Sequence, residues 1–251
     1  MPAPSAIVKP RYDAALIEEA VAHTLRARPR APYWRERSRV YDLEDEERKA
    51  REFLDLASAE FERLGLGKPV DRALRERPIL AGAVEGCLVA PAVTSRDEGA
   101  ELFVAREAGS ARKSIVIRLR PSSFAEPGRL LALLRHEVYH IADMVDPSFG
   151  YDPFLEEAAE EDPARVKLLV SRYAALWDAT IDGRLAREGR APAAARAFRE
   201  REFAAAFPML GDSREPAFRR WFDETLPTHE SLIAFARRPS CQAAPAGPPR
   251  P

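Results

Sequence analysis

Residues 133–146 read LLRHEVYHIADMVD. Apolar residues recur in this stretch at helical spacing, which predicts an amphipathic helix from about Arg129 to Val145. His136 and His140 lie four positions apart, so on a helix both imidazoles project from the same face. The whole chain has only 4 histidines, and two of them are here. The stretch therefore predicts a helix that presents two histidines together.

Short runs rich in β-branched residues come before this helix. Turn residues separate the runs, which cover residues 86–93, 101–106 and 114–120. The last run alternates apolar with partly polar positions, and its apolar side consists of Ile115, Ile117 and Leu119. Such alternation predicts strands with one face against a core.

Helical spacing dominates the rest of the chain. Before the strands it predicts a helix over 13–27 and a longer one that begins after the capping residue Asp42 and ends before Gly65. After the HEVYH stretch it predicts helices over 163–189, 193–206, 215–225 and 229–237. We therefore expect an α+β, helix-rich fold. A small antiparallel or mixed sheet is followed by the helix that carries the histidines and by a C-terminal helical half.

These patterns also predict how the chain is organised. We expect an N-terminal helical extension over 1–80, which starts with a loose leader at 1–12. A main domain over 81–238 should follow, and then a tail over 239–251. The tail is rich in proline, alanine and glycine and has too little apolar surface to bury, so we expect it to be disordered.

Composition narrows the class of protein. The formal net charge is −1, which does not favour binding to nucleic acid through overall charge. The basic segment 26–39 contains Tyr33 and Trp34, which could stack on single-stranded nucleic acid, but the acidic segment 42–47 follows directly and favours a solvated, locally paired stretch. The chain has two cysteines without a CxxC spacing, which fits a reducing compartment, so we expect a cytoplasmic protein. It has no apolar stretch of about 20 residues, so we expect no membrane span.

The HEVYH residues have the types and spacing of a metal site. On a helix, His136 and His140 can each direct a ring nitrogen at one ion such as Zn²⁺. Glu137 projects about 100° round the helix from His136, so it is better placed to reach a water on the ion than to bind the ion itself. An ion of this kind lowers the pKa of its water, and the carboxylate can accept the proton.

With strands before it, the HEVYH helix resembles that of the zincin metallopeptidases. The resemblance covers roughly residues 84–190 and rests mainly on HEVYH. It implies a zinc-dependent peptidase with a zincin-like domain, which cleaves amide bonds in a peptide or protein. It also implies that an edge strand of the sheet holds the extended substrate, and 114–120 is the candidate strand. The alternative interpretation is a helix with two incidental histidines.

A zincin needs one more protein ligand, and the sequence offers three sources. Asp146 follows His140 by six residues, but the metzincin pattern requires glycine at position 143, where this chain has Asp143. A second source is an acidic cluster that is typical of a solvated loop and consists of Glu156, Glu157, Glu160 and Glu161.

The third source is the stretch LWDATIDGRL at 176–185. The gluzincin branch carries a later NExxxD pattern, and Asp178 and Asp182 have its carboxylate spacing, with Trp177 in place of Asn. Asp178 lies at the edge of the apolar arc and is the favoured ligand, while Asp182 would brace the site, although the two roles could be exchanged. A small-residue stripe (Ala175, Ala179 and Gly183) would allow close helix approach. Otherwise the acids pair with Arg172 or with arginines of 184–187.

A further histidine is a candidate for transition-state stabilisation. His229 follows Thr228, which is a suitable N-cap, and could donate to a developing oxyanion as Tyr or His often does in zincins. An exposed residue in the first helical turn is the plainer interpretation of His229, and a core tyrosine that of Tyr173. Taken together, the sequence predicts a zinc metallopeptidase. The alternatives are a helical binding protein with a structural zinc and a nucleic-acid-associated factor.

Overall fold

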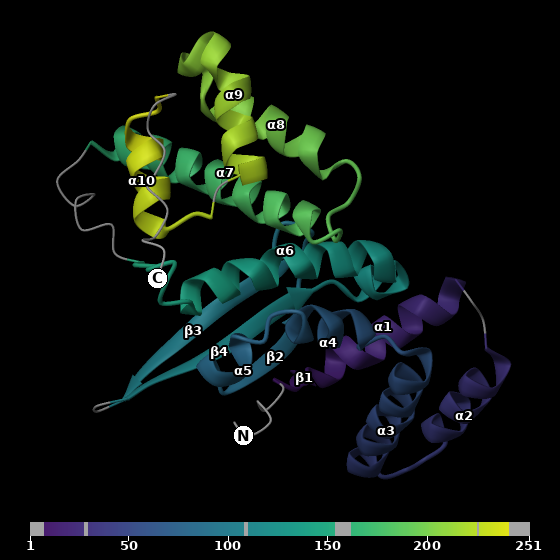
Figure 1. Cartoon of the computed structure of the whole chain (residues 1–251). Coiled ribbons are helices and arrows are strands. Elements are labelled where there is room, and N and C mark those ends of the chain that lie inside the picture. Colours follow the sequence, from purple (N-terminus) through teal and green to yellow (C-terminus); the bar gives the residue numbers. More distant parts are fainter. Residues whose placement is uncertain (1–7, 28–29, 108–109, 154–161, 225, 241–251) are drawn as a thin grey trace, which may run out of the picture. The chain divides into compact units, whose positions relative to one another are not determined.

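The computed structural model describes residues 8–27, 30–107, 110–153, 162–224 and 226–240 (Figure 1). Helices predominate, and four strands form one small mixed sheet, so the predicted α+β, helix-rich fold class is confirmed. The chain divides into two compact units, residues 1–141 and 142–251. The boundary between them falls inside one continuous helix, α6 (Pro127–Val145).

The sheet belongs to the first unit. Its strands are β1 (Pro10–Tyr12), β2 (Gly86–Pro91), β3 (Gly99–Glu107) and β4 (Ser110–Leu119). Their order is β1-β2-β4-β3, with β1 and β4 parallel to β2 and with β3 antiparallel to β4. The alternation predicted for β4 is confirmed, because its core-facing residues Ile115, Ile117 and Leu119 are fully buried.

The strand expected to bind substrate is not at the edge of the sheet. β4 pairs with β2 on one side and with β3 on the other, so its backbone groups are already used in the ladders. The assignment of 114–120 to an edge strand is therefore wrong. Among the described residues, β3 pairs with a strand on one side only and is the edge strand next to β4.

Helices surround the sheet in the first unit. They are α1 (Ala14–Ala27), α2 (Ala31–Tyr41), α3 (Glu46–Leu64), α4 (Lys68–Arg75), α5 (Leu80–Ala83) and the 3-10 turn η1 (Pro121–Ala125). α1 packs against α3 and η1. In α6, Glu137 contacts the start of β3 through the backbone N–H of Ala100. This contact holds the histidine-bearing helix against the sheet.

Two local predictions in this unit are wrong, and a helix forms where none was predicted. The expected loose leader contains β1, because residues 10–12 pair with β2. The part of the basic segment from Ala31 onwards lies in α2, since Pro32 occupies the first turn of this helix, where no N–H is needed. The side chain of Asp45, not that of Asp42, caps α3 by accepting from the N–H groups of Glu47 and Arg48.

The second unit is helical throughout its described residues. It contains α7 (Pro163–Arg187), α8 (Ala195–Ala206), the 3-10 segment η3 (Pro208–Ser213), α9 (Arg214–Arg219), the π-helical turn η4 (Arg220–Glu224) and α10 (His229–Arg237). Its core includes a cluster of buried aromatic side chains, which are Phe203, Phe207, Phe218, Trp221 and Phe235. No described helix is long and apolar enough to cross a membrane. The acidic cluster at 156–161 and residues 241–251 of the predicted tail lie outside the described residues.

We expect Gly183 to be required for the packing of α7 against η4. A Cβ at this position would lie 1.9 Å from the backbone oxygen of Phe222, so backbone would have to move. Gly183→Ala should lower the free energy of unfolding by about 1–3 kcal/mol or more, measured by urea denaturation. Gly128→Ala, where no atom lies within 4 Å, is the matched control and should be neutral or slightly stabilising. A wild-type urea midpoint for Gly183→Ala would contradict this close packing.

Candidate metal centre

Helix α6 brings the two imidazoles of HEVYH together. The Nε2 atoms of His136 and His140 lie 3.2 Å apart, and both side chains are half-buried. The rings are nearly perpendicular, with an interplanar angle of 75° and centroids 4.9 Å apart. The helical period produces this arrangement, since residues at i and i+4 stack along one face. Two ring nitrogens therefore point towards a common position.

This spacing fits a pair of zinc ligands. Two nitrogens bound tetrahedrally at about 2.0–2.1 Å from one ion must lie about 3.3 Å apart, from the geometry of the tetrahedron. The observed 3.2 Å agrees with that value. An N–H···N hydrogen bond between the rings would also give such a distance, and it would occupy one lone pair that a metal needs.

Glu137 lies beside the start of the edge strand. Its Oε2 accepts a hydrogen bond of 3.3 Å from the backbone N–H of Ala100, and it approaches the backbone at Gly99. A Cβ at position 99 would lie 3.1 Å from that oxygen, so the glycine leaves room for the carboxylate. A cavity of about 620 Å³ opens here and is lined by the segment 91–101 together with Arg118 and Glu137. A carboxylate that reaches an open cavity can exchange protons with a bound molecule.

In the second unit, α7 carries the two aspartates proposed from the sequence. One guanidinium holds both, because Arg199 of α8 donates from Nε to Asp182 at 2.6 Å and from Nη1 to Asp178 at 3.1 Å. Arg199 also binds Glu202 at 2.5 Å, and its side chain is only 12% exposed. Asp178 is half-buried and Asp182 is buried.

Arg199 is a residue that sequence reasoning missed. The sequence shows only that Arg199 and Glu202 lie one turn apart on an amphipathic helix. The aspartates that Arg199 also binds are about 20 positions away in the chain, so no local pattern indicates that pairing. The arginines that were expected to pair with the aspartates bind elsewhere. Arg172 donates to the backbone oxygen of Ala206, and Arg187 to that of Phe222.

Arg184 binds Asp143, the residue at the position where the metzincin pattern has glycine. Asp143 is 5% exposed and receives both ends of the guanidinium at 2.8 and 2.6 Å. Trp177 donates its Nε1–H to the same carboxylate at 2.7 Å. Asp143 lies inside α6, so the chain makes no sharp turn there, and Asp146 is engaged by the N–H and hydroxyl of Ser148.

His229 sits in an aromatic enclosure in the second unit. Its Nδ1 lies 2.8 Å from the hydroxyl of Tyr173, and the rings of Phe149, Tyr151 and Tyr173 lie around it. Thr228 caps α10 as predicted, but His229 is 7% exposed, so the expectation of an exposed residue is wrong. Burial lowers the pKa of His229 and raises that of Tyr173. The burial of His229 was not predictable from nearby residues, because the aromatic residues of this enclosure are spread over 149–177 in the sequence.

Gly183, the last residue of the small-residue stripe on α7, packs against backbone of the second unit. It faces the backbone of η4, and the fully buried Ala179 lies one turn before it. Within the second unit, the glycine therefore makes room for η4.

Comparison of the chain with protein-family models, with curated proteins and with solved structures finds no match.

The buried histidine makes unfolding sensitive to pH. Because burial lowers the pKa of His229 below the ordinary 6.5, the unfolded state takes up a proton first as the pH falls. The free energy of unfolding should therefore decrease from pH 8 towards pH 5, and His229→Gln should flatten this decrease. Urea unfolding at a series of pH values measures both slopes. Equal pH slopes of the unfolding free energy in the wild type and in His229→Gln would contradict the lowered pKa of His229.

Proposed function

We propose that the protein is a zinc-dependent peptidase that cleaves amide bonds in peptides or proteins in the cytoplasm. The observation that supports this most strongly is the 3.2 Å approach of the His136 and His140 ring nitrogens, with Glu137 between them in sequence and directed at a cavity. A zinc bound there would supply a Lewis acid that polarises an oxygen ligand.

Asp178 is the third ligand that we propose. The carboxylate spacing of Asp178 and Asp182 on α7 supports this choice, and His136, His140 and Asp178 are side chains of the types that hold zinc. Arg199 would fix the Asp178 carboxylate, as hydrogen bonds to metal-binding carboxylates commonly do, and Asp182 would brace Arg199.

Glu137 is the proposed general base. Its carboxylate accepts the proton of the attacking water and then passes it to the leaving amine, as a base and acid in turn. The hydrogen bond from Ala100 orients the carboxylate without consuming both of its oxygens. His229 remains a predicted donor to the developing oxyanion. Since its Nδ1 faces Tyr173, Nε2 is the ring atom that would donate.

The edge strand is the proposed place for the substrate backbone. One side of β3 has no strand partner within the part of the chain that the structure describes, and the first residues of β3 line the cavity that Glu137 also lines. An extended peptide can add to such an edge through main-chain hydrogen bonds. The binding of nucleic acid receives less support. In the basic segment Tyr33 is 2% exposed, and the Arg37 guanidinium lies 4.6 Å from the ring centre of Phe53.

We expect one zinc per chain in the purified protein, measured by elemental analysis after dialysis. His140→Ala should lose stoichiometric zinc because one of two clustered nitrogens is gone, and Asp178→Ala should lose it at micromolar free metal. The control is His23→Ala, which removes an exposed histidine on α1. Full zinc occupancy in His140→Ala would overturn the proposed centre. Occupancy retained in Asp178→Ala but lost in Asp182→Ala would exchange the roles of the two aspartates.

We expect Glu137→Gln to keep its zinc and lose peptidase activity. The amide preserves the shape of the side chain but cannot take up a proton, and loss of a general base typically costs about 10²–10⁴-fold in rate. Turnover of a mixed peptide library, followed by mass spectrometry, measures the effect. Near wild-type turnover by the variant would rule out Glu137 as the base. A zinc-loaded wild type that cleaves no peptide would instead favour a structural zinc.

A further inference from the structure

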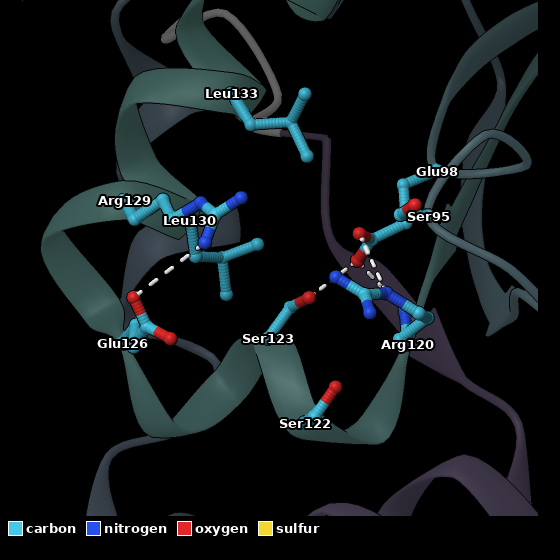
Figure 2. A pocket seen from close by; sticks show the side chains of 9 residues that line it. All are labelled: Ser95, Glu98, Arg120, Ser122, Ser123, Glu126, Arg129, Leu130 and Leu133. Carbon is cyan, nitrogen blue, oxygen red and sulfur yellow. Dashed lines mark hydrogen bonds and ion pairs between the residues drawn. The ribbon is translucent and has the colours of Figure 1, made fainter.

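A second cavity, of about 340 Å³, lies near the N-terminal end of α6 (Figure 2). Its lining residues come from three neighbouring parts of the first unit. They are Ser95 and Glu98 before β3, Arg120, Ser122 and Ser123 in and before η1, and Glu126, Arg129, Leu130 and Leu133 at the end of the loop and on α6. In Figure 2 the side chains of Arg120 and Arg129 approach the cavity from opposite walls, and the two leucines form an apolar wall.

The acceptor groups of this cavity are already in use. Glu98 accepts from the backbone N–H of Arg120 at 3.0 Å, from Nε of Arg120 at 2.9 Å, and from the hydroxyl of Ser123. Its side chain is only 7% exposed. Burial acts to raise the pKa of Glu98, but the hydrogen bonds from Ser123 and Arg120 outweigh burial and leave the pKa below its ordinary value. Glu98 therefore stays ionised and holds Arg120 in place.

Several donor groups remain available. Within the described residues, no hydrogen bond reaches the two terminal nitrogens of Arg120 or the hydroxyls of Ser95 and Ser122. Arg129 is 78% exposed and lies 3.9 Å from Glu126, which is too far for a hydrogen bond. The cavity thus offers donors from two guanidinium groups and two hydroxyls, with an apolar surface beside them.

This cavity adjoins the proposed catalytic residues. Glu98 lines both this cavity and the one that contains Glu137. On α6, Leu133 precedes Glu137 by one turn, so both project towards the same side of the helix. A peptide that lies along β3 with its scissile bond at Glu137 would therefore extend a side chain or its end towards Arg120 and Arg129.

We propose, on the basis of the proposed peptidase function, that this cavity binds a carboxylate of the peptide substrate. A planar carboxylate matches the fork of a guanidinium, and hydroxyl donors complete its coordination. The two arginines and two glutamates leave the wall formally neutral, which favours a singly charged carboxylate over a doubly charged phosphate. Two sources share this chemistry: the C-terminus of a peptide and the side chain of Asp or Glu.

The test compares matched peptides on zinc-loaded, full-length protein. One arm pairs a free C-terminal carboxylate with its amide, and the other pairs an internal Glu with Gln. We expect wild-type kcat/KM to favour the carboxylate in one arm by about tenfold, as for a hydrogen bond to a charged group. Arg129→Glu should abolish the preference, since it replaces an exposed cation by an anion. Arg120→Lys should weaken it, because lysine keeps a charge beside Glu98 but offers no fork.

Arg112→Ala is the control, because Arg112 pairs with Glu85 and lines neither cavity. Binding of the same peptides to Glu137→Gln protein, measured by fluorescence anisotropy, separates this inference from the peptidase function. Arg129-dependent binding of the carboxylate peptides without any cleavage by the wild type would retain the carboxylate site and reject the peptidase. Cleavage without a carboxylate preference in either arm would overturn the carboxylate site. Absence of both binding and cleavage would overturn both.

Discussion

The buried carboxylate of Asp143 is the constraint that fixes the end of α6 to the helices of the second unit. A charge that is 5% exposed must be paired, and Asp143 is paired three times, by both ends of Arg184 and by the indole of Trp177. Removing one partner of such a buried pair typically costs about 3–5 kcal/mol. The pair therefore holds the last turns of α6 against α7. Because α6 is one continuous helix, the same face of it carries His136 and His140 one and two turns earlier.

The aspartates of α7 have a structural role that the structure describes, beside the metal role that we propose. Arg199 is nearly buried and binds Asp178, Asp182 and Glu202, so the four groups carry a formal charge of −2. Three carboxylates around one guanidinium give these four groups a formal excess of negative charge, which is compatible with a divalent cation nearby. Arg199 therefore does not argue against the proposed metal role of Asp178. It holds the carboxylate in place, and in the proposed centre the same carboxylate would also bind the ion.

The sequence predicted those features that depend on residues close together in the chain, and missed those that depend on contacts between distant positions. Helical periodicity located α1, α3, α6, α7 and α10, and the HEVYH spacing located the histidine pair, because both are local. Strand order was not predictable, since the edge position of β3 follows from pairings across the sheet and not from its own residues. The partners of Asp178 and His229 were missed for the same reason: Arg199 and the aromatic enclosure come from distant positions. Asp143 was interpreted only as a departure from a glycine pattern, and its role as a buried anchor needed α7 in place.

X-ray absorption at the zinc edge of the full-length protein, loaded with one equivalent of zinc, tests the proposed centre most directly. The proposed centre predicts two imidazole nitrogens at about 2.0–2.1 Å, with the remaining first-shell atoms oxygen at about 2.0–2.2 Å and no sulfur. A sulfur scatterer at about 2.3 Å would place the ion at a cysteine instead, and a first shell without imidazole would show that the HEVYH histidines do not bind it.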